Sequence, residues 1–384
     1  MSRAGTRLVD RLIRAGKPGR ELGQRLDLAR SVGPSWSRRL ARDASGPGER
    51  ARDAVYREIW ESAAASVGAR VTVVDGALLE ISLGDARTRV WHNLVPIDDP
   101  VALRLSGNKP LTQRLLDGAG LPTPEHVVVD AGDIGPAESL LARTGGPLVV
   151  KPAEGTIRGH GITCGVRSTI DLQRARLRAA RHGDRLVVER QASGQEYRVL
   201  VLDGEVLDAV RREPPRVIGD GHSSVGDLVV AENRRRTDSD GTAGLFPLTV
   251  DLDLIFTLRS AGVGLRTVLP AGDILEVKSA ANENSPSENR SALDEVGDAL
   301  RSDAVLAART LGLRLAGVEV ITPDPARSLT EAGGVLLEVN GNPGLHYHYQ
   351  VADPATATDV GVLLLRRLLN LPPTSPSTRK RSTR

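Results

Sequence analysis

The N-terminal segment, residues 1–66, carries apolar side chains at helical spacing. Leu8 and Leu12 fall on one helix face, and Val55 and Ile59 repeat that spacing after a Ser/Gly/Pro-rich interruption. This pattern predicts helices separated by a loop.

The next segment changes to short β-rich runs. These runs occupy 71–74, 78–81 and 88–91, and they are broken at Gly76 and Gly84, as hairpin turns would be. Together with the preceding helices, they predict a small α/β lobe at the start of the chain.

The remainder reads as a mixed α and β body that begins near residue 100. A helix is expected at 110–119, where it follows an acidic, proline-containing link and ends at Gly120. Further apolar runs predict strands and helices in alternation. The strands are expected at 127–129, 148–151, 186–189, 197–202, 316–321 and 335–340, and the helices at 136–143 and 169–181.

Composition narrows the class of protein. The chain has 384 residues, and 51 basic against 48 acidic residues leave a net charge of only +3, which does not indicate a nucleic-acid partner. No apolar stretch approaches the roughly 18 residues that a membrane span needs, so a cytoplasmic protein without a membrane partner is expected. The single cysteine, Cys164, is interpreted as a packing residue.

Lysine usage is the first chemical signal, because the chain uses arginine almost everywhere and keeps five lysines. Lys17 and Lys380 lie near the ends, whereas Lys109, Lys151 and Lys278 lie in the body. A compact ammonium on a long stem is a good phosphate partner. The surroundings of the three body lysines are therefore candidate phosphate sites.

A glycine-bearing loop follows Lys151 directly. Gly155, Gly159 and Gly161 leave backbone amides that could wrap a polyphosphate, although a surface turn would use the same residues. After this loop, Glu189 closes one predicted strand and Glu196 opens the next. Carboxylates at these positions could accept bonds from an amino group and a ribose, or they could be solvated charges at strand ends.

A third constellation lies near the C-terminus. Glu319 falls within the strand run 316–321, and Glu338 and Asn340 fall within the run 335–340. Carboxylates within β-branched runs are costly to bury unless they are paired, and Mg²⁺ held by a few protein oxygens and substrate phosphates is a natural partner. Metal ligation is favoured over structural pairing.

These pieces, in this order, resemble the ATP-grasp superfamily, specifically the ATP-grasp module of cyanophycin synthetase and of fused bacterial glutathione synthetases. The resemblance covers about residues 100–352 and includes all three body lysines. The matching stretches are 106–116, 147–152, 187–190, 196–201, 215–221, 268–274, 278–282, 316–321 and 337–344.

The resemblance implies an α/β (α+β) fold in which two α+β lobes clamp ATP, with the small α/β lobe at the N-terminus. The expected units are an N-terminal helical and α/β lobe at 1–100, a first ATP-grasp subdomain at 101–188, a second subdomain with the metal site at 189–371, and a disordered basic tail at 372–384.

The resemblance also implies roles for individual residues. Lys109 and Lys151 would contact ATP phosphates, the loop 155–161 would close over them, Glu189 would lie at the adenine and Glu196 at the ribose. Mg²⁺, with Mn²⁺ as a substitute, would be held against the phosphates. Its ligands would be Glu319, Glu338 and Asn340, while Arg212, Lys278 and Asn282 would steady the γ-phosphate and the acyl phosphate formed from it.

Departures from the family pattern concern the loop and the substrate side. The glycine loop is one residue longer, with a different segment at 156–158, and the segment 283–287 replaces an expected Ser-Thr-Gly-Gly. His346 takes the place of an expected arginine. His346 and His348 are expected to contact substrate, because two histidines alternating along an extended segment would point to opposite faces and could not share a metal.

The function implied is an ATP-dependent ligase that activates a carboxylate as an acyl phosphate and joins it to an amine, with an amino acid or small peptide as substrate. The alternative from another class is an inactive ATP-binding sensor or partner subunit. The motifs also leave open a thiol or hydroxyl acceptor, and the oligomeric state, with a homo-oligomer as one option.

Overall fold

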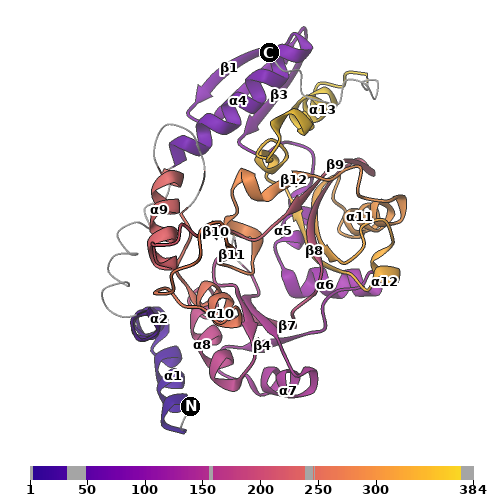
Figure 1. Ribbon diagram of the computed structural model, residues 1–384. Helices are drawn as coiled ribbons and strands as arrows, with labels where there is room; N and C mark the ends of the chain where they lie inside the picture. Colours follow the sequence, from indigo (N-terminus) through magenta and orange to yellow (C-terminus); the bar gives the residue numbers. More distant parts are fainter. Residues whose placement is uncertain (1–2, 33–48, 155–158, 238–244, 246, 373–384) are drawn as a thin grey trace.

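The computed structural model describes residues 3–32, 49–154, 159–237, 245 and 247–372, and Figure 1 shows their arrangement. Two antiparallel sheets form the body, a third small sheet belongs to the N-terminal lobe, and a two-stranded ribbon lies beside the body. The predicted interruption at 45–48, Gly155, and residues 373–384 of the predicted tail lie outside the described residues.

The N-terminal segment contributes to two places. Helices α1 (Arg3–Arg14) and α2 (Gly16–Val32) pack on α8 (Thr169–Ala179), at the lower left of Figure 1. Helix α4 (Glu49–Val67) instead packs on α13 (Val360–Leu368) and on the small meander. The meander consists of β1 (Arg70–Asp75), β2 (Leu78–Leu83) and β3 (Ala86–Trp91).

The four-stranded sheet has the order β4-β7-β5-β6. Its strands are β4 (His126–Asp130), β5 (Leu148–Pro152), β6 (Thr163–Val166) and β7 (Arg185–Arg190), and all neighbours are antiparallel. Side chains alternate along β5, so that Leu148 and Val150 join the core beneath α7 (Gly135–Thr144) and α8. Val149 and Lys151 consequently face the opposite side.

The five-stranded sheet has the order β12-β9-β8-β13-β14. On one face it packs against α11 (Asp298–Thr310), α5 (Pro100–Ser106) and α6 (Lys109–Gly118). Its other face meets the core of the N-terminal lobe through residues such as Leu200 and Leu202. The strands are β8 (Gln195–Leu202), β9 (Glu205–Arg212), β12 (Asn289–Ser291), β13 (Leu315–Thr322) and β14 (Val335–Gly341).

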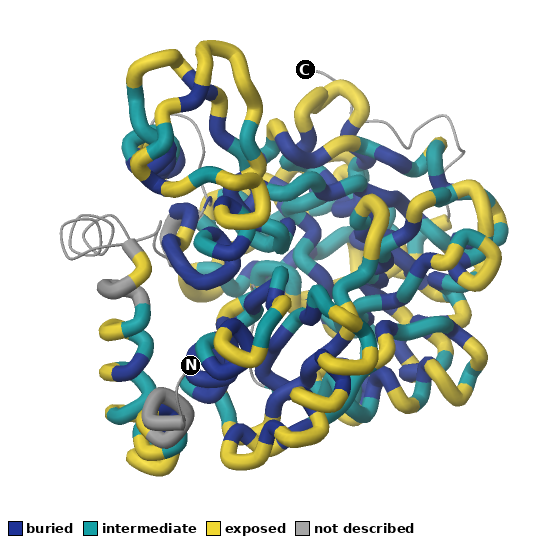
Figure 2. Tube along the Cα trace, turned by 60° about the horizontal axis from the view of Figure 1, so that its bottom comes forward, coloured by how far each residue is buried: buried dark blue, intermediate teal, exposed yellow. Residues whose placement is uncertain are grey.

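The remaining elements flank the opening between the two sheets. The ribbon of β10 (Arg216–Ile218) and β11 (Ile274–Glu276) lies next to α9 (Val225–Thr237) and α10 (Leu252–Ser260). Figure 2 shows buried chain in the interior and exposed chain at the peripheral turns. Short 3-10 turns, η1 (Ala281–Glu283), η2 (Pro286–Glu288), η3 (Leu345–His348) and η4 (Pro354–Thr356), and helix α12 (Leu329–Ala332) complete the fold.

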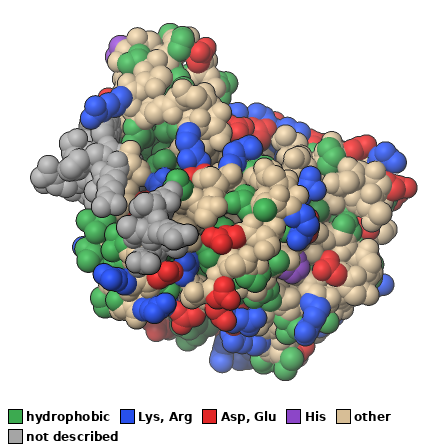
Figure 3. All heavy atoms as spheres, turned by 90° about the horizontal axis from the view of Figure 1, so that it is seen from below, with side chains coloured by type: hydrophobic (Ala, Val, Ile, Leu, Met, Phe, Trp, Pro, Cys, Tyr) green, Lys and Arg blue, Asp and Glu red, His purple; other side chains and the backbone are tan. Residues whose placement is uncertain are grey.

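The elements expected from the apolar pattern are present within a few residues of their predicted bounds, and the α+β class is confirmed. The pattern did not reveal β6, β9 or the ribbon, because these are short or carry polar residues along their length. On the face drawn in Figure 3, basic and acidic side chains are interspersed, in line with the small net charge. No helix among the described residues is long and apolar enough to cross a membrane.

Candidate active site

A cavity of about 730 Å³ lies between the two main sheets. Strands β5 and β7 supply one wall, and β8, β9, β13 and β14 supply the other, while α4 closes one end. The predicted site residues that line it are Lys109, Lys151, Gly159, Glu189, Glu196, Arg212, Asn282, Glu319, Glu338, Asn340 and His346. Residues that are far apart along the sequence thus share one cavity.

Lys151 and Glu189 form an ion pair on the wall made by the four-stranded sheet. Lys151 Nζ lies 2.8 Å from Glu189 Oε1 and 2.7 Å from Oε2, and the lysine is only 5% exposed. Gln113 Nε2 donates to Glu189 Oε2 at 3.1 Å. Both ionic residues stay on the cavity side because β5 and β7 send their alternate residues into the core.

Glu338 and Asn340 reach the cavity because β14 contains a bulge. Glu319 pairs with Glu338 and the next residue, Val320, pairs with Leu336, so β14 has one extra residue at position 337. Leu336 is therefore in the core, whereas Glu338 and Asn340 line the cavity. Without the bulge, strict alternation would put Leu336 and Glu338 on the same face.

Lys109 meets Glu338 from the first turn of α6. Its Nζ donates to Glu338 Oε1 at 3.0 Å. Burial acts to lower the pKa of Lys109, but Glu338, Glu319 and Glu189 outweigh it and the pKa is raised. Burial likewise acts to raise the pKa of Glu338, but Lys109, Lys151 and Arg198 outweigh it and the pKa is lowered. Both groups are thus charged at neutral pH.

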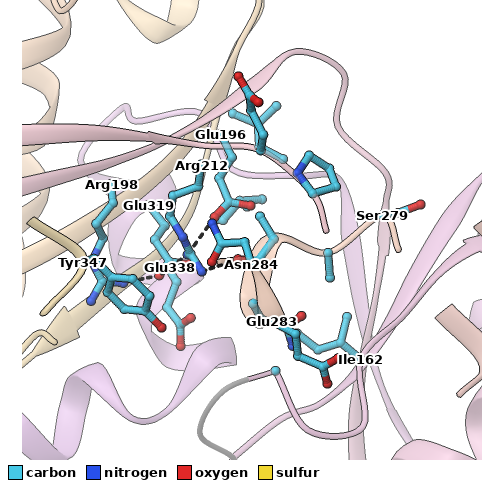
Figure 4. A pocket seen from close by; sticks show the side chains of 18 of the residues that line it. Ile162, Glu196, Arg198, Arg212, Ser279, Glu283, Asn284, Glu319, Glu338 and Tyr347 are labelled. Carbon is cyan, nitrogen blue, oxygen red and sulfur yellow. Dashed lines mark hydrogen bonds and ion pairs between the residues drawn. The ribbon is translucent and has the colours of Figure 1, made fainter. Parts of the chain in front are cut away.

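A row of charged side chains crosses the five-stranded sheet (Figure 4). Arg198, Glu319 and Glu338 are directly opposite one another on β8, β13 and β14. Arg198 donates to Glu319, and Asn340 Nδ2 lies 3.5 Å from the same Glu319 oxygen. Gly317 leaves room for this arrangement, since a Cβ there would lie 2.5 Å from Arg198 Nε.

Arg212, at the end of β9, links Glu196 and Glu319 to the η1 segment. Its Nη1 donates to Glu196 Oε1 at 2.8 Å and lies 3.5 Å from Glu319 Oε1, and its Nη2 donates to the Ala281 carbonyl. The guanidinium also lies 4.7 Å from the centre of the Tyr347 ring. Arg212 therefore contacts the carboxylates of Glu196 and Glu319, the Tyr347 ring and the η1 segment, and it helps to hold all of them in place.

Glu196 gives the site a pH dependence. Burial raises the pKa of Glu196 to about 7, with Glu319 and Glu338 adding to the rise and Arg212 opposing it. Between about pH 4.5 and 7 the unfolded chain therefore ionises while the folded protein keeps the proton, so stability from this group falls as pH rises, by about 1.4 kcal/mol per pH unit at most.

We expect Glu196→Gln to remove that slope, because glutamine stays neutral. Urea unfolding of both proteins at pH 5, 6 and 7.5 measures it, and the wild type should lose stability relative to the variant over this range. Parallel stability curves would contradict the raised pKa of Glu196.

The glycine loop meets the η1 segment at Gly159. A Cβ on Gly159 would lie 1.9 Å from Asn282 Nδ2, and the backbone has φ +68°. Gly161 also has positive φ, but it is not among the lining residues, and a Cβ there would meet His182 and Pro152 at 2.8 Å. The loop backbone thus approaches Asn282 as closely as a residue without a side chain permits.

We expect Gly159→Ala to push the loop away from Asn282 and to weaken ATP binding by about tenfold. Gly262→Ala is the matched control, because Gly262 has φ +72° and open space around its missing Cβ. Both variants should show a similar left-handed backbone strain of roughly 1 kcal/mol. Calorimetric ATP titration separates them, and equal affinities for the two variants would refute the close approach.

The structure corrects the expectation for Lys278. This lysine is 2% exposed and is not among the residues lining the cavity. Its Nζ lies 2.9 Å from both Asp251 Oδ2 and Glu283 Oε2, and these carboxylates outweigh burial and raise its pKa. Lys278 therefore supports the wall residue Glu283 from behind and does not reach into the cavity.

The two histidines differ in a way that the sequence did not indicate. Residues 345–348 form the turn η3, so the assumption of an extended segment was wrong. His346 lines the cavity and shares a 3.0 Å hydrogen bond with the Tyr56 hydroxyl. His348 is fully buried and bonded to Asp208 Oδ2 at 2.7 Å, so the expectation that it contacts substrate is corrected.

Sequence reasoning assigned no role to Arg198, Tyr347 or Arg52, which also line the cavity. Arg198 could have been found, since it lies two positions after Glu196 on one strand and so faces the same side. Arg52 had no local signal in an arginine-rich helix. Cys164 is buried in the wall, and burial raises the pKa of its thiol well above the ordinary value, as suits a packing residue.

The donor set fits a magnesium ion that is completed by substrate. No group of three or more His, Cys, Asp and Glu side chains among the described residues is placed to hold a metal alone. Two carboxylates, Glu319 and Glu338, lie with the Asn340 side chain beside Lys109 and Arg198. Mg²⁺ typically takes one or two carboxylates together with phosphate oxygens and water.

Comparison with known sequences finds relatives of the body of the chain. Cyanophycin synthetase of Nostoc sp. is 31% identical over 276 residues, covering 71% of this chain and 30% of that protein. The glutathione biosynthesis bifunctional protein GshAB of Enterococcus faecalis is 28% identical over 284 residues, covering 71% of this chain and 37% of that protein. The chain thus spans about a third of these relatives. No family model matches it.

Comparison with solved structures agrees with this fold. A bifunctional glutathione synthetase from Pasteurella multocida superposes with a TM-score of 0.51 at 23% identity, covering 79% of this chain and 41% of that one. This likeness supports the arrangement of sheets and helices described above. The chain is therefore a member of the ATP-grasp superfamily and resembles the ATP-grasp modules of these enzymes.

Proposed function

We propose that the chain is an ATP-dependent ligase that activates a carboxylate as an acyl phosphate and joins it to an amine, releasing ADP and phosphate. The observation that carries this proposal is the convergence of Lys109, Lys151, Glu319, Glu338 and Asn340 in one cavity between two sheets. Phosphoryl transfer needs charge neutralisation and in-line placement rather than a protein nucleophile, and the cations and carboxylates of this cavity support the proposal by supplying groups for the first.

The nucleotide would occupy the side of the cavity formed by β5, β7 and the turn between β7 and β8. Val149 and Ile162 offer apolar contacts for the base there. Lys151 is poised beside Glu189, where it can reach a phosphate while the carboxylate accepts from the adenine amino group. Glu196, at the start of β8, is suited to accept bonds from the ribose hydroxyls.

Magnesium would be held by Glu319, Glu338 and Asn340, where it would neutralise phosphate charge. Lys109 donates to one oxygen of Glu338 and Arg198 to one oxygen of Glu319. These two contacts hold the carboxylates in orientations that face the cavity. Arg212, which lies 3.5 Å from Glu319 Oε1, and Asn282, which lies against Gly159, would steady the transferring group.

The chemistry proceeds in two displacements. A carboxylate oxygen of the donor attacks the γ-phosphorus, the bond to the bridging oxygen breaks, and ADP leaves. The amine nitrogen then attacks the acyl carbon, phosphate leaves, and the nitrogen loses a proton. The partial burial of Glu319 and Glu338 between the sheets would limit the access of bulk water to the hydrolysable acyl phosphate.

The test is ADP release by purified protein with Mg-ATP and pooled amino acids and small peptides, with hydroxylamine present to trap an acyl phosphate as hydroxamate. ADP and hydroxamate appearing together support the ligase, and dividing the pool identifies the donor. Binding of ATP without either product would instead favour the sensor alternative.

A further inference from the structure

The end of the cavity farthest from the nucleotide side is made by the N-terminal lobe. Helix α4 supplies Arg52, Val55 and Tyr56, and the turn after β3 supplies Asn93. These residues precede the stretch 100–352, whose sequence motifs resemble those of ATP-grasp modules. The N-terminal lobe therefore lines the same cavity as Glu319 and Glu338, which belong to the five-stranded sheet.

Arg52 differs from the other cations that line the cavity. Each of the others has a carboxylate partner, whereas Arg52 makes no ion pair within the part of the chain that the structure describes. The paired cations are Lys109 with Glu338, Lys151 with Glu189, Arg198 with Glu319, Arg212 with Glu196, and Arg216 with Glu213. A half-buried guanidinium without an anion is suited to receive one from a ligand.

The guanidinium of Arg52 is held in place by neutral groups. Its Nη2 donates to Asn93 Oδ1 at 2.8 Å, and Asn93 in turn donates to the carbonyl of Asn342. The guanidinium carbon lies 5.7 Å from the centre of the Tyr56 ring. This leaves other N–H groups of the planar fork to bind both oxygens of a carboxylate.

Aromatic side chains join Arg52 to the reacting centre. The Tyr56 hydroxyl shares a hydrogen bond with His346, the His346 ring lies 4.1 Å from the Tyr347 ring, and Tyr347 lies against Arg212. Burial lowers the pKa of His346 to about 3, with Arg52, Arg198 and Arg212 adding to the effect. This end therefore combines a neutral imidazole with positive field, which favours an anion.

We propose that Arg52 binds a substrate carboxylate other than the one that is phosphorylated, and so selects substrates with a free second carboxylate. The inference rests on the proposed ligase function and names its substrate class. The carboxylate belongs either to the amine acceptor, as the α-carboxylate of an amino acid, or to the donor, as its unactivated second carboxylate.

The experiment compares binding of amino acids and dicarboxylic amino acids with binding of their amides. Calorimetry is run on the full chain with Mg²⁺ and a non-hydrolysable ATP analogue, so that no turnover is required. The variants are Arg52→Ala and Arg52→Lys. Arg57→Ala is the control, because Arg57 lies on the same helix, donates to the Gly76 carbonyl and does not line the cavity.

The wild type and Arg57→Ala should prefer at least one free acid over its amide by roughly 10- to 100-fold, which is the range for a hydrogen bond to a charged group. Arg52→Ala should lose that preference, and Arg52→Lys should recover part of it. If Arg52→Ala loses only the preference for acids over their α-amides, the carboxylate bound by Arg52 belongs to the acceptor. If it loses only the preference for acids over their side-chain amides, that carboxylate belongs to the donor.

Two outcomes overturn the inference. One is a wild-type protein that does not distinguish acids from amides, including one that binds neither. The other is an Arg52→Ala variant that keeps the full preference. Hydroxamate formation by the wild type together with either outcome would leave the ligase proposal standing while this inference fails.

Discussion

Glu338→Gln should lower the rate of Mg-ATP-dependent ADP release by about 10²- to 10³-fold, the range seen when one preorganised electrostatic group is removed from an active site. The substituted side chain would be neutral and could offer the metal one amide oxygen in place of a carboxylate. The variant should keep its fold, because the amide oxygen still accepts from Lys109. The measurement is steady-state ADP release across a Mg²⁺ titration, with unfolding monitored in parallel.

Glu276→Gln is the matched control for this prediction. Glu276 lines the same cavity from the β10-β11 ribbon and is paired in register with Arg216, away from Lys109. Its activity should stay within about twofold of wild type. A Glu338→Gln protein with normal activity and an unchanged Mg²⁺ requirement would refute the assignment of Glu338 to the metal.

Lys151→Met should destabilise the protein by about 3 to 5 kcal/mol, the cost of breaking a buried ion pair from one side. Glu189 would remain buried at 3% exposure with Gln113 as its remaining donor. Adding Glu189→Gln removes the orphaned charge, so the double variant should recover most of the lost stability. Urea unfolding of the two single variants and the double variant measures this coupling.

Affinity for ATP should behave differently from stability in the same set of variants. A phosphate contact by Lys151 is worth about 10- to 100-fold in affinity. The double variant should therefore remain weak in ATP binding although it is folded. Recovery of both properties together would show that Lys151 acts only through stability.

Local patterns predicted the body of the fold because its main strands are short apolar runs. The run from Leu148 to Lys151 has three apolar residues before the lysine, so the pattern predicts the strand, whereas packing decides that Lys151 leaves the core side. The same holds for Glu189, which follows Val188 in β7. Strand β9 was missed because its residues include Glu205, Asp208 and Arg211, which a pattern search interprets as loop.

The candidate site was predictable as a set of residue types but not as a set of roles. Lys278 and Lys151 have similar sequence surroundings, with each at the end of an apolar run. The structure pairs Lys278 with Asp251 and with the wall residue Glu283 from behind the cavity wall, and pairs Lys151 with Glu189 inside the cavity. Which carboxylate lies nearby depends on elements that are distant in sequence, and no local pattern encodes that.

The sequence by itself determined the α+β body, the strand positions of Lys151 and of the glutamates, and the resemblance that joins them, because each depends on local periodicity or motif order. The tertiary structure alone decided three further points. The bulge at residue 337 turns Glu338 into the cavity, the turn η3 separates His346 from the buried His348, and α4 brings Arg52 to the far end of the site. Each depends on strand register or on packing between distant segments, which are set by the whole chain and not by any window of it.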